Sequence, residues 1–151
     1  MRSDVINQNS NSYGEVPSVY KIEAKTAAFT AVDGFCYLVT DLDGCAVTLP
    51  APNVGDKIKI VFGAVTSNSH TITCDATSTL FSGYALMLDG VDATAGQNVV
   101  FAADESDDDV FTMNGSTTGI AAVVELVGIS NNRWYIEALC YASGTSATPF
   151  S

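Results

Sequence analysis

The chain has 151 residues and a mass of 15.8 kDa, which suits one domain with a full hydrophobic core. Hydrophobic residues make up 47% of the chain and charged residues only 15%, so Ser, Thr and Asn provide much of its polarity. Six basic residues against 17 acidic ones give a net charge of −11, which argues against binding nucleic acid or an anionic membrane surface.

Residues 1–18 form a polar segment rich in Asn and Ser, which predicts an extended or disordered N-terminal arm. The first twenty residues lack the apolar core of a signal peptide. Residues 120–129 are the longest apolar stretch, and Glu125 interrupts them, so no membrane span is expected. We therefore expect a protein made and kept in a cytosol, or released from it by lysis.

From Val19 onward, short runs rich in β-branched and aromatic residues alternate with Gly, Pro, Asp and Asn. The clearest run is KIKIVF at 57–62, where Ile58, Ile60 and Phe62 share one face, as in a half-buried strand. The segments that we expect to be strands are 18–24, 35–40, 46–49, 57–62, 70–74, 84–88, 98–103, 110–113, 121–128 and 133–141.

About 8–10 short strands with frequent turns predict an all-β fold, an antiparallel β-sandwich or barrel. Asp-Gly and Asn-Gly steps between the strands favour the turns that close hairpins. TAAFTAV at 26–32 is the one segment that fits a helical turn. The predicted domain covers residues 19–142 and is followed by a C-terminal tail at 143–151.

The residue types that carry most catalysis are scarce or badly placed. His70, the single histidine, shares a strand face with Ile72 and Cys74, which favours a structural role. Trp134 alternates with apolar residues and is expected in the core. The chain has no GxSxG elbow, phosphate-binding glycine loop or CxxC pair. We therefore expect no enzyme activity and no cofactor.

The cysteines are Cys36, Cys45, Cys74 and Cys140. Each one has apolar or β-branched neighbours in sequence, so we interpret all four as small buried hydrophobic residues rather than as disulfides.

The acidic run at 104–109 has two interpretations. Its carboxylates are ligands that Ca²⁺ prefers, but the ligand spacing and the glycine of a known calcium loop are missing. Like charges in sequence also repel one another, which favours a solvated loop. DLDG at 41–44 resembles the start of an EF-hand loop but lies between two strands, so a β-turn is expected there. No metal is expected at either place.

The two ends of the chain carry apolar residues among polar ones. Phe150 either folds onto its own domain or docks on a neighbouring molecule. The candidate partner-binding residues of the two ends are Tyr13, Val16, Pro17, Tyr20, Pro149 and Phe150.

Two parts of the chain resemble a pattern of small structural proteins from tailed bacteriophages. Residues 35–83 contain a strand, the step VTLPAP, an alternating strand in GDKIKI, and SHTIT. Residues 119–150 contain an apolar strand, a strand with WYI, and the ending ATPF. On these motifs the chain resembles the capsid decoration, or cement, proteins.

The resemblance implies a jelly-roll-like β-sandwich that assembles as a homotrimer. It also implies a place on the outer surface of the virion's capsid, with the major capsid protein as partner and assembly in the host cytoplasm.

Two other functions stay open. Similar strings occur in receptor- or glycan-binding modules of phage tail fibres and spikes, which would need exposed aromatics such as Tyr84 or Tyr141 over a shallow groove. A glycan-cleaving enzyme would depend on carboxylates such as Glu125 and Glu137, but no aromatic sugar platform flanks them in sequence.

Overall fold

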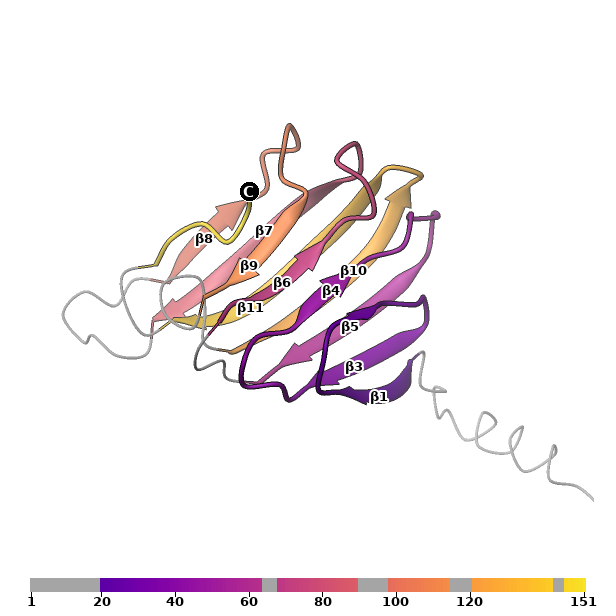
Figure 1. Cartoon of the computed structure of the whole chain (residues 1–151). Coiled ribbons are helices and arrows are strands. Elements are labelled where there is room, and N and C mark those ends of the chain that lie inside the picture. The colour runs from indigo at the N-terminus through magenta and orange to yellow at the C-terminus, as the bar shows by residue number, and fades with distance from the viewer. Residues whose placement is uncertain (1–19, 64–67, 90–97, 115–120, 143–145) are drawn as a thin grey trace, which may run out of the picture.

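The computed structural model describes residues 20–63, 68–89, 98–114, 121–142 and 146–151, and these residues form two β-sheets (Figure 1). The large sheet has seven strands in the order β1 (Lys21–Lys25), β3 (Phe35–Val39), β5 (Lys57–Phe62), β10 (Ala121–Ser130), β11 (Arg133–Ala142), β7 (Leu80–Asp89) and β8 (Val99–Ala102). The small sheet has four, in the order β2 (Phe29–Thr30), β4 (Ala46–Thr48), β6 (His70–Thr73) and β9 (Val110–Met113). The all-β prediction is confirmed.

The strands from β1 to β6 alternate between the two sheets, so that β1, β3 and β5 lie in the large sheet and β2, β4 and β6 in the small one. Neighbours within each set are parallel. Parallel neighbours need a long crossover connection, and here the crossover is a strand of the opposite sheet. This first part of the chain is therefore a flattened coil, which we call the N-terminal coil.

The prediction of purely antiparallel strands is wrong, because five of the nine strand pairs described are parallel. The Asp-Gly steps before β3 and β4 do not close hairpins. Gly34, Gly44 and Gly55 have φ values of +81°, +99° and +94°, a left-handed conformation that suits glycine. Each lies one or two residues before a strand of the coil, where the chain turns into the opposite sheet.

The rest of the chain, from β7 to β11, adds antiparallel pairs. β7 pairs with β8, β10 pairs with β11, and β10 also pairs with β5, which joins this part to the coil. β11 runs parallel to β7, and β9 completes the small sheet beside β6. We call residues 80–142 the hairpin region.

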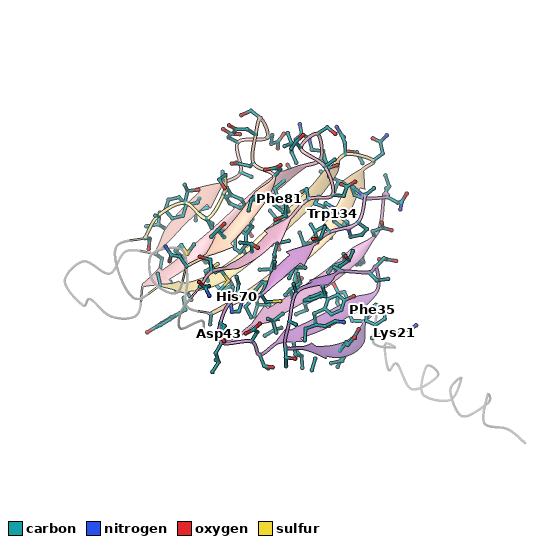
Figure 2. The ribbon with its side chains drawn as sticks, in the orientation of Figure 1. Lys21, Phe35, Asp43, His70, Phe81 and Trp134 are labelled. Atoms are coloured by element: carbon teal, nitrogen blue, oxygen red, sulfur yellow. The ribbon has the colours of Figure 1, made fainter. Side chains whose placement is uncertain are left out.

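The hydrophobic core lies between the two sheets, where Figure 2 shows Trp134 and Phe81 among the side chains that fill the space. Trp134 is fully buried, and its indole N–H donates a hydrogen bond to the Pro50 carbonyl oxygen at 3.2 Å. Burial of an apolar side chain of this size contributes about 1.5–3 kcal/mol. The predicted inward faces of 57–62 and 133–141 are confirmed, as is the place of Trp134 in the core.

Two local expectations are wrong. Residues 26–32 do not form a helical turn, because Phe29 and Thr30 are the strand β2, and the Phe29 ring packs 4.5 Å from that of Tyr37. β7 begins at Leu80 rather than at 84 and continues through Gly83. The predicted arm, residues 1–18, lies outside the described residues. In the part of the chain that is described, no helix is long and apolar enough to cross a membrane.

Candidate functional site

The outward face of the large sheet carries a row of apolar side chains that crosses all seven strands. Strand register places one such residue on each strand, directly beside the next. The members of this apolar row are Ala24, Leu38, Val61, Val123, Leu139, Leu86 and Val100. Leu38, Leu139 and Val100 are 38%, 46% and 61% exposed. With strands about 4.8 Å apart, the row is about 30 Å long.

A second row lies beside the apolar row, two residues away along each strand, and we call it the polar row because Lys59, Glu125, Glu137 and Tyr84 form its centre. Its members on the other strands are Ile22, Cys36 and Ala102. At its centre Lys59 Nζ lies 2.7 Å from Glu125 Oε1, and this bond raises the pKa of Lys59. Glu125 is directly opposite Glu137 on the next strand. The hydroxyls of Tyr84 and Tyr135 donate long hydrogen bonds of 3.4 and 3.3 Å to Glu137 Oε1. The pair of carboxylates is therefore held by one lysine and two phenols.

Two shallow hollows lie on this face. The first, of about 350 Å³, has Tyr84, Leu86 and Leu139 on its walls together with Glu125 and Glu137. The second, of about 300 Å³, lies along the other side of the apolar row and includes Tyr141, Leu88 and Ala121. Tyr84 and Tyr141, named from the sequence as candidate exposed aromatics, are 37% and 38% exposed here. The face therefore combines apolar contact area with a few polar groups that fix orientation.

Tyr20, one of the predicted partner-binding residues, belongs to the same face. It precedes β1, at the position beside Gly34, whose carbonyl oxygen accepts a hydrogen bond from the Lys21 N–H at 2.7 Å. Burial raises the pKa of Tyr20, and the nearby Glu125 carboxylate raises it further while Lys59 opposes the shift. Tyr20 therefore lies beside the polar row, within electrostatic reach of Lys59 and Glu125. The other predicted residues of the arm, Tyr13, Val16 and Pro17, lie outside the described residues.

Pro149 and Phe150 are buried against their own chain. Phe150 is 6% exposed, and its ring lies 5.6 Å from Phe111 and 6.3 Å from Phe81. The Thr112 N–H donates to the Pro149 carbonyl at 2.8 Å, so the tail extends the small sheet beside β9. Of the two interpretations of Phe150, folding onto its own domain describes this structure, and neither side chain is offered to a partner.

His70 occupies a structural position. It is fully buried, its Nδ1 accepts a hydrogen bond from the Cys45 N–H at 2.9 Å, and its ring stacks on Phe62 at 4.9 Å. Its Nε2 is buried with no hydrogen-bond partner among the described residues. Burial lowers the pKa of His70, so the fold favours the neutral ring.

Three of the four cysteines are buried as predicted. Burial raises the pKa of Cys74 and of Cys140 to about 12, and it also raises the pKa of Cys45. Cys36 differs because it lies half-buried in the polar row, beside Lys59.

The acidic run at 104–109 forms the connection between β8 and β9. Carboxylate oxygens of Asp104, Asp107 and Asp108 lie within 4.8 Å of one another. Asp108 accepts a hydrogen bond from the Asp104 N–H at 2.5 Å, and Asp104 accepts one from the Ser106 N–H at 2.8 Å. Burial raises the pKa of Asp108, which is 8% exposed. These bonds give the carboxylates a role in shaping the loop, which is solvated as predicted except at Asp108.

Comparison of the chain with protein-family models, with curated protein sequences and with solved structures gave no match. Only the geometry of the candidate site therefore indicates what it does. Sequence reasoning missed the apolar row, whose signal in the sequence is an apolar residue on the polar face of an alternating strand. Val61 in KIKIVF and Leu139 in RWYIEALCY are such residues.

Proposed function

We propose that this chain is a structural virion protein, a capsid decoration protein that binds the outside of a phage head as a homotrimer and stabilises the shell. In this proposal the two sheets form a jelly-roll-like sandwich that serves as an inert scaffold. The motifs shared with decoration proteins support it, as does the open form of the candidate site, in which Glu125 and Glu137 lie on a broad face and not in a cleft.

The apolar row is the observation that carries the proposal. A soluble monomer rarely exposes a continuous apolar patch larger than about a few hundred Å², and larger patches mark protein contact sites. Here the row crosses every strand of the large sheet and is bordered by only a few charged groups. We assign this face to contacts between copies of the chain, where burial of Leu38, Leu139 and Val100 would stabilise the assembly.

A trimer would hold the shell by multivalency. Three weak contacts to neighbouring capsid subunits act together at high effective concentration and give strong overall binding. The net charge of −11 per chain suits a protein that coats a DNA-filled particle, because it discourages binding to nucleic acid. In the proposed location, assembly takes place in the host cytoplasm, where thiols such as Cys36 stay reduced.

The proposal is tested by the mass of the protein in solution. We expect the full chain to sediment as three copies of 15.8 kDa, and Leu139→Asp to sediment as a monomer because it places a charge in the apolar row. Val54→Asp is the matched control, since Val54 is 78% exposed and precedes β5 in a turn. A monomeric wild-type protein would overturn the trimer. Electron microscopy of virions labelled with an antibody against the chain should show label on heads, and label on tails would favour the second candidate.

The second candidate is a receptor- or glycan-binding module of a tail fibre or spike. The hollow at Tyr84 favours it, because an exposed ring beside the Glu137 carboxylate is a combination that suits a sugar. A glycan array probed with the wild-type chain and with Tyr84→Ala tests it. Binding that Tyr84→Ala removes would support this candidate, and a blank array for the wild type would refute it.

A further inference from the structure

We propose that residues 1–19 of one copy lie across the apolar row of an adjacent copy. This inference rests on the proposed homotrimer and names the segment that makes the contact between copies. Three features of the structure lead to it: the shape of the apolar row, the place where the described chain begins, and the chemistry of the polar row.

The apolar row is long enough to bind an extended segment of chain. It is about 30 Å long, with the polar row of Lys59, Glu125 and Glu137 along one side and, at its centre, Ala121, Tyr141 and Leu88 along the other. About nine extended residues span that length, and nineteen residues reach about 60 Å. Residues 1–19 are therefore long enough to leave one copy and still cover the whole row on the next.

The direction of β1 indicates an adjacent copy rather than the same one. Along β1, Ala24 lies in the apolar row and Ile22 in the polar row, and Tyr20 lies beyond them, beside Gly34. Followed backwards from Ala24 to Tyr20, the described chain thus crosses the polar row and moves away from the apolar row. Residues 1–19 would have to reverse direction to cover their own apolar row, whereas the row of a neighbouring copy needs no such reversal.

The chemistry of the segment fits the two rows. Residues 1–19 contain apolar side chains for the apolar row, among them Val5, Ile6, Tyr13 and Val16. Between them stand neutral donors, mostly Asn and Ser. These suit Glu137, which is in neither of the two ion pairs found among the described residues and whose hydrogen bonds from Tyr84 and Tyr135 are long, at 3.4 and 3.3 Å. The segment has one arginine against two carboxylates, so it brings little additional charge to the contact.

A photo-crosslinking experiment on the full-length protein tests the inference. Tyr13 is replaced by the photoreactive residue benzoylphenylalanine, and equal amounts of ¹⁵N-labelled and unlabelled chains are mixed, exchanged and irradiated. The same probe at Val54, exposed in a turn before β5, is the matched control. We expect crosslinked peptides that pair the two isotopes and join position 13 to the outward face of β5, β10, β11 or β7, and none of these from position 54.

The outcomes separate this inference from the proposed function. Crosslinks from position 13 within single chains only, crosslinks to other surfaces, or none at all in a protein that sediments as a trimer would overturn the inference and leave the trimer standing. A protein that sediments as a monomer would overturn both. A chain beginning at Tyr20 provides a second measurement, for which we expect at least a tenfold weaker trimer. An unchanged dissociation constant for that chain contradicts the inference.

Discussion

The N-terminal coil and the hairpin region build the same large sheet in different ways. In the coil, β1 to β6 change sheet at every step and have only parallel neighbours within their sets. In the hairpin region, β7 with β8 and β10 with β11 form antiparallel pairs within one sheet. The apolar row crosses both parts and exists only because β5 pairs with β10. The candidate site is thus a property of the joined molecule and of neither part alone.

The two parts also differ in charge. Residues 20–74 carry four lysines against five carboxylates, a net charge of −1, whereas residues 80–142 carry one arginine against nine carboxylates, a net charge of −8. Lys59 of the coil pairs with Glu125 across the joint between the parts. The coil therefore supplies most of the cations that offset the acidic hairpin region, and the polar row lies where the two meet.

Glycine substitutions should give the largest difference in stability between the two parts. A Cβ atom at Gly83 in β7 would lie 2.1 Å from the Ile136 backbone oxygen, and φ there is +127°. We expect Gly83→Ala to lower the free energy of unfolding by more than about 3 kcal/mol, because neither backbone can move away. Gly55→Ala in the coil, with nothing within 4 Å, should cost about 1 kcal/mol from its positive φ alone. Urea denaturation measures both, and equal losses would contradict the packing described for β7.

The tail offers a second test, since it ties the chain after the hairpin region to the small sheet. Phe150→Ala removes a ring that packs against Phe81 and Phe111. We expect a loss of about 3 kcal/mol in the free energy of unfolding, as for other buried phenylalanines. Val54→Ala, at a side chain that is 78% exposed, should change it by less than about 0.5 kcal/mol. If the two variants were equally stable, the tail would not belong to the core in solution.

The smallest expected effect is a pH dependence that belongs to the coil. Burial lowers the pKa of His70 below its usual 6.5, and the Gly63 backbone and the Asp41 charge oppose that shift only in part. As the pH falls, His70 therefore binds a proton near pH 6.5 in the unfolded chain but only at a lower pH in the folded chain. Stability is full above that pH and falls as the pH drops through the window between the usual pKa and the lowered one.

The measurement is the melting temperature between about pH 7.5 and about pH 5.5, a range above the titration of most carboxylates. His70→Gln is the control, because its side chain offers a hydrogen-bond acceptor but does not titrate. The wild-type melting temperature should fall more over this range than that of the variant. Parallel curves would show that His70 is not held neutral by the fold.

The sequence revealed the elements of the fold better than their connections. The alternation in KIKIVF places Ile58 and Ile60 in the core whatever strands lie beside them, so a local pattern was enough. An Asp-Gly step, in contrast, looks the same whether the chain turns back on itself or passes into another sheet. The Asp-Gly steps at Gly34 and Gly44 therefore predict hairpins where the chain forms the coil. β2 has two residues, which is too short for any period to appear.

The candidate site was harder to predict for a related reason. Val61 and Val123 are adjacent in the large sheet but far apart in the chain, so their contact depends on a register that no local pattern contains. Tyr20 was identified from its place beside the arm and does lie on the candidate face. The sequence indicates that Phe150, an apolar residue in a polar tail, is covered by something, but only the structure shows that its own core covers it.

The absence of hairpins from the N-terminal coil has a consequence for how the molecule acquires its structure. β1, β3 and β5 cannot pair with one another directly from a tight turn. Each pair must first close a loop that passes through the opposite sheet. β10 and β11, joined by a short turn, can nucleate in microseconds, whereas non-local parallel pairing is slow. Refolding should therefore start from the later strands, and the earlier half should be the last to become protected from hydrogen exchange.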